Sequence, residues 1–201
     1  MTPQPDWMIL ALAAAGGYLF GSIHFGLVLT KFAGLGDIRA IGSGNIGATN
    51  VLRTGRKGLA AATLILDGAK GAAAALAALA LAGRDPALVA GLFAVFGHNF
   101  PVWLKFKGGK GVATTFGTLI ALAWPVGVAA CLTWIAVAAL FRISSLAALA
   151  GLGLAPLYAY ALGDYPAAVL ALILGALGFA RHHQNIRRLL KGEEPRIGRK
   201  S

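Results

Sequence analysis

Residues 105–112 read KFKGGKGV, and long runs of apolar residues precede and follow them. Glycine permits backbone conformations that other residues avoid, so amide N–H groups can point together at a ligand, and lysine adds positive charge. The stretch therefore predicts a phosphate-binding loop at a membrane surface. It is not a Walker loop, because Leu104 stands where that pattern needs glycine and Gly111 where it needs serine or threonine. A solvated basic turn is the alternative that these residues alone leave open.

The composition places the apolar runs in a membrane. Of the 201 residues, 58% are hydrophobic and 12% are charged, which is too apolar and too poor in charge for a soluble domain. A net charge of +11 would suggest nucleic acid as a partner of a soluble protein, but here the basic residues flank apolar runs. We therefore expect membrane lipids and anionic substrates as partners, and no nucleic acid. We expect a single integral membrane domain over residues 1–201.

An all-α bundle of about seven transmembrane helices, some of them short, accounts best for the apolar runs. The expected helices cover 7–29, 58–82, 87–104, two segments within 112–141, 144–162 and 167–180. The two segments meet at Pro125, because a single crossing over 112–141 would put basic residues on both sides of the membrane. The first of them, 112–123, is only about 18 Å long. A five-span alternative would put Asp164 in the middle of the membrane, which is costly.

The distribution of Lys and Arg predicts the orientation. All Lys and Arg except Lys70 and Arg84 lie in the loops 31–57 and 105–111, at Arg142, or in the tail 181–201. The seven-helix topology places these segments on one side of the membrane. Cytoplasmic loops carry an excess of Lys and Arg, so we predict that this side, with the basic tail, is cytoplasmic and that the N-terminus lies outside.

A second polar loop, IGSGNIGATNVLR over residues 41–53, is rich in hydrogen-bond donors. It contains the pattern Gly42-x-Gly44-x-x-Gly47, but no strand precedes it, so we exclude a dinucleotide-binding fold. Its amides and hydroxyls, together with the Arg53 guanidinium, favour a second anion-binding loop. A capping turn before a short helix is the alternative.

The basic tail opens with RHHQNIRRLL over residues 181–190, in which His182 and Asn185 share one face of a helix. This face is suited to contact a substrate at the membrane surface. The other basic residues of the tail are expected to lie on anionic lipid: Arg187, Arg188, Lys191, Arg196, Arg199 and Lys200. No Asp or Glu of the cytoplasmic side is expected to be well placed for proton transfer.

Charged and titratable residues also occur inside the apolar runs. Asp67 and Lys70, three residues apart, are expected to form a structural ion pair between helices, because unpaired charges in a membrane are costly. His24 and His98 are expected to take part in hydrogen-bonded packing. A small anion transporter is a rival function, favoured by the glycines, the interrupted helices and the charged pair, but we find no convincing inverted repeat. A lipid-surface scaffold would leave the Ser, Asn and His placements unexplained.

Several motifs together resemble one family. They are Gly21-Ser22, residues 43–50 with Arg53, residues 97–101 running into 106–114, and residues 181–189. The family is that of the bacterial acyl-phosphate:glycerol-3-phosphate acyltransferases, and the resemblance extends from about Tyr18 to Glu194.

The resemblance implies a multi-pass enzyme of the bacterial inner membrane with its active site at the cytoplasmic face. It would transfer a fatty acyl group from acyl phosphate to the sn-1 hydroxyl of glycerol 3-phosphate. The product is lysophosphatidic acid, and the reaction is the first step of bacterial phospholipid synthesis. An upstream enzyme that forms acyl phosphate becomes a candidate partner, and we expect no metal and no organic cofactor.

The site residues are predicted from this chemistry. Catalytic roles are assigned to Lys110, Ser43, His182 and Asn185. Substrate binding is assigned to a larger set: Arg53, Gly44, Asn45, Thr49, Asn50, Lys107, Gly108, Gly109, Gly111, Ser144 and Ser145. We expect Lys110 and Ser43 on the acyl-phosphate group, and Arg53 with His182 and Asn185 on glycerol 3-phosphate. Either His182 or a phosphate oxygen of a substrate accepts the proton. The His-x-x-x-x-Asp motif of soluble-type glycerolipid acyltransferases is missing, so acyl-CoA is not the expected donor.

Overall fold

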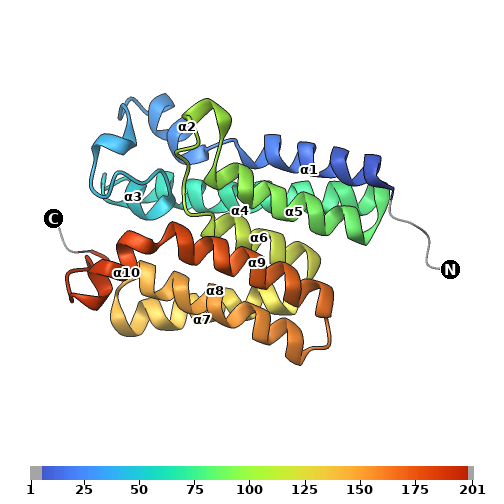
Figure 1. Ribbon diagram of the computed structural model, residues 1–201. Helices are drawn as coiled ribbons and strands as arrows, with labels where there is room; N and C mark the ends of the chain where they lie inside the picture. Colours follow the sequence, from blue (N-terminus) through green and yellow to red (C-terminus); the bar gives the residue numbers. More distant parts are fainter. Residues whose placement is uncertain (1–5, 199–201) are drawn as a thin grey trace.

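The computed structural model describes residues 6–198, and every regular element in this part of the chain is a helix. Apolar helices run side by side as a bundle (Figure 1): α1 (Trp7–Gly21), α4 (Lys57–Ala82), α5 (Arg84–Asn99), α6 (Val112–Leu122), α7 (Trp124–Phe141), α8 (Ser144–Ala161) and α9 (Tyr165–Arg181). Shorter elements lie at one end of this bundle: α2 (Phe25–Phe32), α3 (Ala48–Leu52), α10 (His183–Leu190) and the 3₁₀ helices Ile38–Ala40 and Val102–Leu104. The predicted all-α membrane bundle is confirmed.

The lengths of the helices fit a membrane protein with some short crossings. Within residues 6–198, five helical segments are long and apolar enough to span a membrane, and α9 joins α10 across a bend of 65°. Helix α6 is shorter, about 16 Å at 1.5 Å per residue, compared with a hydrocarbon core of about 30 Å. Pro125 lies in the first turn of α7, where its missing N–H breaks no helical hydrogen bond. The predicted division of 112–141 into two helices is therefore confirmed.

Two of the predicted spans are broken. Residues 7–29 form α1 and α2 rather than one helix, because the chain is extended at His24, with φ −105° and ψ 95°. The Ser22 hydroxyl donates to Tyr18 O at 2.7 Å, and a lysine from α4 donates to the carbonyl oxygen in the break. Residues 87–104 are also interrupted, because α5 ends at Asn99. Neighbouring helices satisfy the exposed backbone groups, so hydropathy does not reveal such breaks.

The charged pair Asp67 and Lys70 lies within α4, where Lys70 Nζ is 2.9 Å from Asp67 Oδ1. The prediction of an ion pair between helices is wrong, because a spacing of three residues puts both side chains on one face of the same helix. Both side chains also reach beyond α4, since Asp67 Oδ1 lies 3.9 Å from His98 Nδ1, and Lys70 makes the closer contacts. Lys70 donates to Ile23 O in the break between α1 and α2, and its Nζ is 2.8 Å from His98 Nδ1 in α5.

Glycines bring the backbones of neighbouring helices into direct contact. A Cβ on Gly117 of α6 would lie 2.0 Å from Gly68 O of α4, and one on Gly21 of α1 would lie 1.9 Å from Ala94 O of α5. Small residues permit such close approach in membranes, where packing replaces the hydrophobic effect between helices. The contact with Gly68 holds the middle of α6 against the middle of α4.

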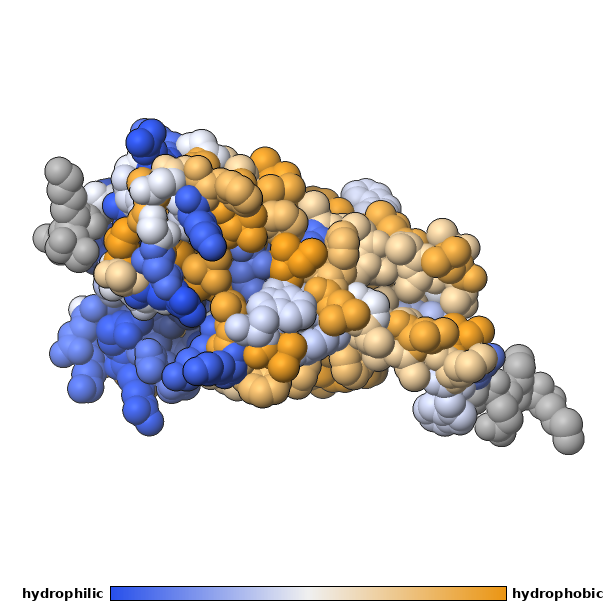
Figure 2. All heavy atoms as spheres, turned by 90° about the horizontal axis from the view of Figure 1, so that it is seen from above, coloured by the Kyte–Doolittle hydropathy of each residue, from blue (hydrophilic) through white to orange (hydrophobic). Residues whose placement is uncertain are grey.

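The two ends of the bundle differ in polarity. The polar loops, α2, α3 and α10 gather at one end, on the left of Figure 1, and Figure 2 shows hydrophilic residues concentrated there. We call this the polar end. At the opposite end, Arg84 forms an ion pair with Asp164 in the turn between α8 and α9. The predicted gathering of the basic loops on one side agrees with this arrangement.

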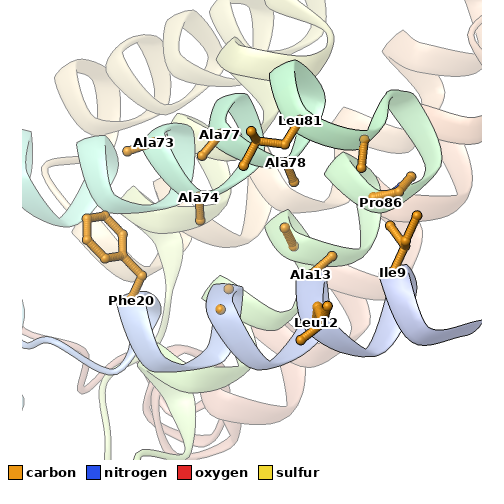
Figure 3. Close-up of a pocket in the computed structure, with 14 residues that line it drawn as sticks. Ile9, Leu12, Ala13, Phe20, Ala73, Ala74, Ala77, Ala78, Leu81 and Pro86 are labelled. Carbon is orange, nitrogen blue, oxygen red and sulfur yellow. The ribbon is translucent and has the colours of Figure 1, made fainter.

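An apolar pocket of about 530 Å³ lies between α1, α4 and α5. Its fourteen lining residues are all apolar, and Figure 3 shows Leu12, Ala77 and Leu81 among them, facing the space between the helices. A lining of apolar side chains offers no side-chain group for polar chemistry. The candidate active site must therefore be sought at the polar end.

Candidate active site

Four segments that are distant in sequence meet at the polar end. They are residues 42–53, the loop 107–111, the junction of α7 with α8, and α10 with the tail that follows it. Thr49 Oγ1 lies 3.1 Å from Ser144 Oγ, which joins the first segment to the third. Lys110 Nζ donates to Asn185 Oδ1 at 2.6 Å, which joins the second to the fourth. The fold thus brings together predicted site residues from the loop 41–53, from the stretch KFKGGKGV, and from the basic tail.

Loop 107–111 is held tightly from two sides. From α5, the carbonyl oxygen of His98 accepts a hydrogen bond from Gly109 N at 3.0 Å. From α9, Arg181 donates to Gly109 O at 3.0 Å and to Gly108 O at 2.8 Å. Space is the reason for the glycines: a Cβ on Gly108 would lie 2.2 Å from His98 O, and one on Gly109 would lie 2.2 Å from His98 Nε2.

The loop leads directly into α6. Gly111 is the N-cap of this helix and has φ +75°, a conformation that suits glycine. The first N–H groups of a helix have no partner within it and carry a partial positive charge. Lys110 therefore lies beside the N-terminus of α6, which also attracts anions.

Lys110 is the central cation of the site. Burial lowers the pKa of its ammonium to about 8, with Glu194 opposing the shift and the charges of Arg188, Arg53 and Arg181 adding to it. Several cations around one partly desolvated position attract an anion strongly. The arrangement is therefore suited to bind phosphate.

Glu194 holds this cluster together, although it is not among the predicted site residues. Its Oε1 accepts hydrogen bonds from Asn185 Nδ2 at 2.5 Å and from Ser145 Oγ at 2.7 Å, and its Oε2 accepts one from Arg188 Nε at 2.6 Å. Burial acts to raise the pKa of this carboxyl group, but the three hydrogen bonds outweigh it and the pKa falls below its usual value. The prediction that no acid of this side is well placed for proton transfer stays a prediction, although Glu194 lies within the cluster. One feature of the sequence could have indicated a role for Glu194, because Glu193 and Glu194 are the only acidic residues in the basic tail 181–201.

Arg188 lies in the same cluster. Its ion pair with Glu194 spans 2.6 Å, a contact within the protein that its predicted role on anionic lipid did not include. Two other tail residues with the same predicted role, Arg199 and Lys200, lie outside the described residues.

Asn50 shapes the loop 42–53 from inside. Its buried amide donates to Ile38 O at 3.0 Å and to Ile41 O at 2.9 Å, while its Oδ1 accepts from the backbone N–H of Ser43 at 3.1 Å. Both N–H groups of this amide are therefore used within the protein, and we expect Asn50 to act by holding Ser43 in place. Asn45 has a similar part, since its Oδ1 accepts from the following turn at 2.9 Å.

The remaining predicted residues differ in their surroundings. Ser43, Gly44 and Arg53 are exposed, and Arg53 Nη1 lies 3.5 Å from Asn50 Oδ1. Lys107 is exposed, and no ion pair or hydrogen bond of its ammonium occurs within residues 6–198. Substrate contact by these residues stays a prediction.

His182 is buried and neutral. Its Nδ1 donates to Gly178 O at 2.7 Å, so the neutral ring keeps its proton on Nδ1 and has an acceptor at Nε2. Burial lowers the pKa of His182 to about 4, and the charge of Lys110 contributes to the shift. A ring with this pKa is a weak proton acceptor at neutral pH.

Comparison with known proteins places these features in one family. The family model described as Glycerol-3-phosphate acyltransferase matches residues 11–192. The glycerol-3-phosphate acyltransferase of Rhodospirillum rubrum is 63% identical over 201 residues, covering 96% of this chain and 93% of that protein. That of Paramagnetospirillum magneticum is 63% identical over 191 residues, covering 95% of each chain.

Two solved structures are similar over most of the chain. The first is a crystal structure of PlsY (YgiH), an integral membrane glycerol 3-phosphate acyltransferase, in its glycerol 3-phosphate form. It has a TM-score of 0.88 and 39% identity, and covers 94% of this chain and 96% of that chain. The second is the lysophosphatidic acid form, with a TM-score of 0.86 and 40% identity, covering 94% of this chain and 95% of that chain.

Proposed function

Because this chain belongs to the glycerol-3-phosphate acyltransferase family, we propose that it takes its acyl group from acyl phosphate and transfers it to the sn-1 hydroxyl of glycerol 3-phosphate. The products are lysophosphatidic acid and inorganic phosphate. The observation that carries the proposal is the half-buried Lys110 beside the N-terminus of α6, with Arg53, Arg181 and Arg188 nearby. This cluster suits a reaction in which both substrates carry phosphate.

We assign the acyl-phosphate group to Lys110, Ser43 and the first turn of α6. An acyl phosphate is already activated, so the protein has mainly to orient the acceptor and to stabilise charge on the departing phosphate and the carbonyl oxygen. Glycerol 3-phosphate is assigned to Arg53, with His182 and Asn185. Of the two serines at the start of α8, Ser144 is the better candidate for substrate contact, because the Ser145 hydroxyl donates to Glu194.

A phosphate oxygen of a substrate is the better candidate for accepting the proton. The attacking hydroxyl oxygen forms a bond to the acyl carbon, the bond from that carbon to the phosphate oxygen breaks, and the hydroxyl proton must leave. His182 is disfavoured by its pKa of about 4. Glu194 is disfavoured because hydrogen bonds from Asn185, Ser145 and Arg188 already occupy it. Its pKa is also below the usual value.

The polar end is proposed to face the cytoplasm of a bacterial cell, with the N-terminus outside the inner membrane. The excess of Lys and Arg at this end supports the orientation. Glycerol 3-phosphate would then enter from the cytoplasm. Acyl phosphate, which carries a long acyl chain, would enter from the membrane, supplied by the upstream enzyme that forms it.

The donor is tested with purified protein in lipid and labelled glycerol 3-phosphate. We expect lysophosphatidic acid when acyl phosphate is offered and none when acyl-CoA is offered. Product from acyl-CoA alone would overturn the donor assignment. A folded protein that forms no product from either donor would contradict the proposed activity.

The pH dependence tests the role of Lys110. A lysine with a pKa of about 8 is cationic below this pH and neutral above it. We therefore expect kcat/KM, which reports groups of the free enzyme, to fall as the pH rises through about 8. The measurement is a profile from about pH 6 to about pH 10. The matched variant Lys110→Arg stays protonated and should lack the fall, at a lower overall rate. A wild-type profile that stays level to the alkaline end would contradict the assignment.

A further inference from the structure

Directly beneath loop 107–111 lies a buried polar cluster that the proposed chemistry does not use. It is formed by Asp67 and Lys70 of α4, His98 of α5, and His24 with Ile23 in the break between α1 and α2. The residues Asp67, Lys70, His98 and His24 are at most 4% exposed. Such a cluster inside a membrane protein is costly, so a role beyond filling space is expected.

Lys70 determines the state of His98. A protonated lysine has N–H donors and no acceptor, so at 2.8 Å it must donate to His98 Nδ1. Neutral His98 then carries its proton on Nε2, the atom that lies against Gly109. The contact with Asp67 at 2.9 Å favours the charged form of Lys70, and the bond to Ile23 O fixes the position of its ammonium group.

His98 holds loop 107–111 in place through two contacts with Gly109. Its side chain packs on Gly109 so closely that a Cβ there would lie 2.2 Å from Nε2. Its carbonyl oxygen accepts from Gly109 N at 3.0 Å and from His24 Nε2 at 2.9 Å. The ring of His24 lies 5.0 Å from the ring of His98 and limits its movement on the other side. Gly109 immediately precedes Lys110.

We propose that Lys70 and His98 are positioning residues for the Lys110 site. Neither is proposed to touch a substrate. Lys70 fixes the tautomer and orientation of the His98 ring, and His98 holds Gly109 so that Lys110 and the start of α6 keep the geometry that binds phosphate. A displacement of about 1 Å at a reacting centre can cost about 100-fold in rate, so a support of this kind affects activity without contacting the ligand.

The test removes both charges of the buried ion pair at once. In Asp67→Asn/Lys70→Met no charge is left unpaired, and replacement of a buried pair by groups of similar volume is often tolerated. We expect a thermal midpoint near that of the wild type but a loss of kcat/KM of about tenfold or more. The matched control Arg84→Gln/Asp164→Asn removes the ion pair at the opposite end and should leave kcat/KM unchanged.

Limited trypsin digestion measures how accessible loop 107–111 is to cleavage and does not depend on acyl transfer. We expect cleavage after Lys107 and Lys110 to be faster in Asp67→Asn/Lys70→Met, with cleavage after the exposed Lys31 as an internal reference. The activity readout rests on the proposed function, whereas the digestion does not. If the wild type formed no product, the proposed function would fail, but the digestion would still test whether Lys70 and His98 hold loop 107–111 in place. Wild-type cleavage and kcat/KM in the double variant would overturn the inference.

A second pair of variants separates positioning from folding if the double variant is unstable. His98→Asn keeps a side-chain acceptor for Lys70, and His98→Leu removes it at similar volume. We expect both variants to lose kcat/KM, because neither keeps the ring that packs on Gly109. His98→Leu should lose about tenfold more than His98→Asn, because only His98→Asn keeps an acceptor for Lys70. Equal activities of the two variants would overturn the inference.

Discussion

Lys110→Met is expected to reduce kcat/KM by about 1,000-fold, because removal of a preorganised donor that stabilises developing charge costs 10²–10³ and here a full charge is lost as well. The variant also leaves Asn185 Oδ1 without the donor that now lies at 2.6 Å. Binding of the phosphate group and charge stabilisation on the departing phosphate should both suffer. The measurement is the initial rate of lysophosphatidic acid formation at limiting acyl phosphate.

The matched control for this variant is Lys105→Met. Lys105 is an exposed lysine at the other end of the KFKGGKGV stretch, with φ 52°. Its replacement lowers the net charge equally but leaves the site intact, so we expect its kcat/KM to stay within about threefold of the wild type. If Lys110→Met retained a tenth of the wild-type value, the assignment of the anion site would be wrong.

Glu194→Ala is expected to damage both stability and activity. The change removes the acceptor for Asn185, Ser145 and Arg188 at once. Because Arg188 is partly exposed, we expect a loss of about 2–3 kcal/mol in the free energy of unfolding rather than the larger cost of a fully buried pair. Activity should fall by about 100-fold, since Asn185 then no longer holds Lys110 in place. Thermal unfolding followed by circular dichroism in detergent, together with the acyl transfer assay, measures both effects.

Glu193 provides the matched control for Glu194. It is the neighbouring residue, it is exposed, and Glu193→Ala should change neither the thermal midpoint nor the rate. Glu194→Gln is expected to fall between the wild type and the alanine variant, because the amide oxygen still accepts hydrogen bonds but carries no charge. A Glu194→Ala protein with the wild-type midpoint would show that the tail does not depend on this contact.

The membrane bundle was predictable because a bilayer places the same demand on every crossing. Each span must be apolar and long enough, and its backbone groups must be paired internally, so hydropathy and helix length locate the helices. The basic residues also predict which end of the bundle faces the cytoplasm, and this orientation stays a prediction. The break at Pro125 was also predictable, since proline is favoured in the first turn of a helix.

The candidate residues of the site were selected by their type and by the family resemblance, and their roles stay predictions. Glycine and lysine in KFKGGKGV indicate anion binding, and the structure places Lys110 against Asn185 as part of one site. The family itself is confirmed by the comparison over residues 11–192.

Other parts were decided only by the tertiary structure. The break after Gly21 depends on Lys70 of a different helix, Glu194 acts through residues of α8 and α10, and His98 acts through its contact with Gly109. In each case the partners are far apart in sequence or belong to different helices. Hydropathy and residue type report what a segment prefers by itself, whereas a hydrogen bond between helices depends on which faces the packing brings together. The sequence alone therefore determined the membrane fold and the residue types of the loop, and the packing of the helices decided which polar groups contact that loop.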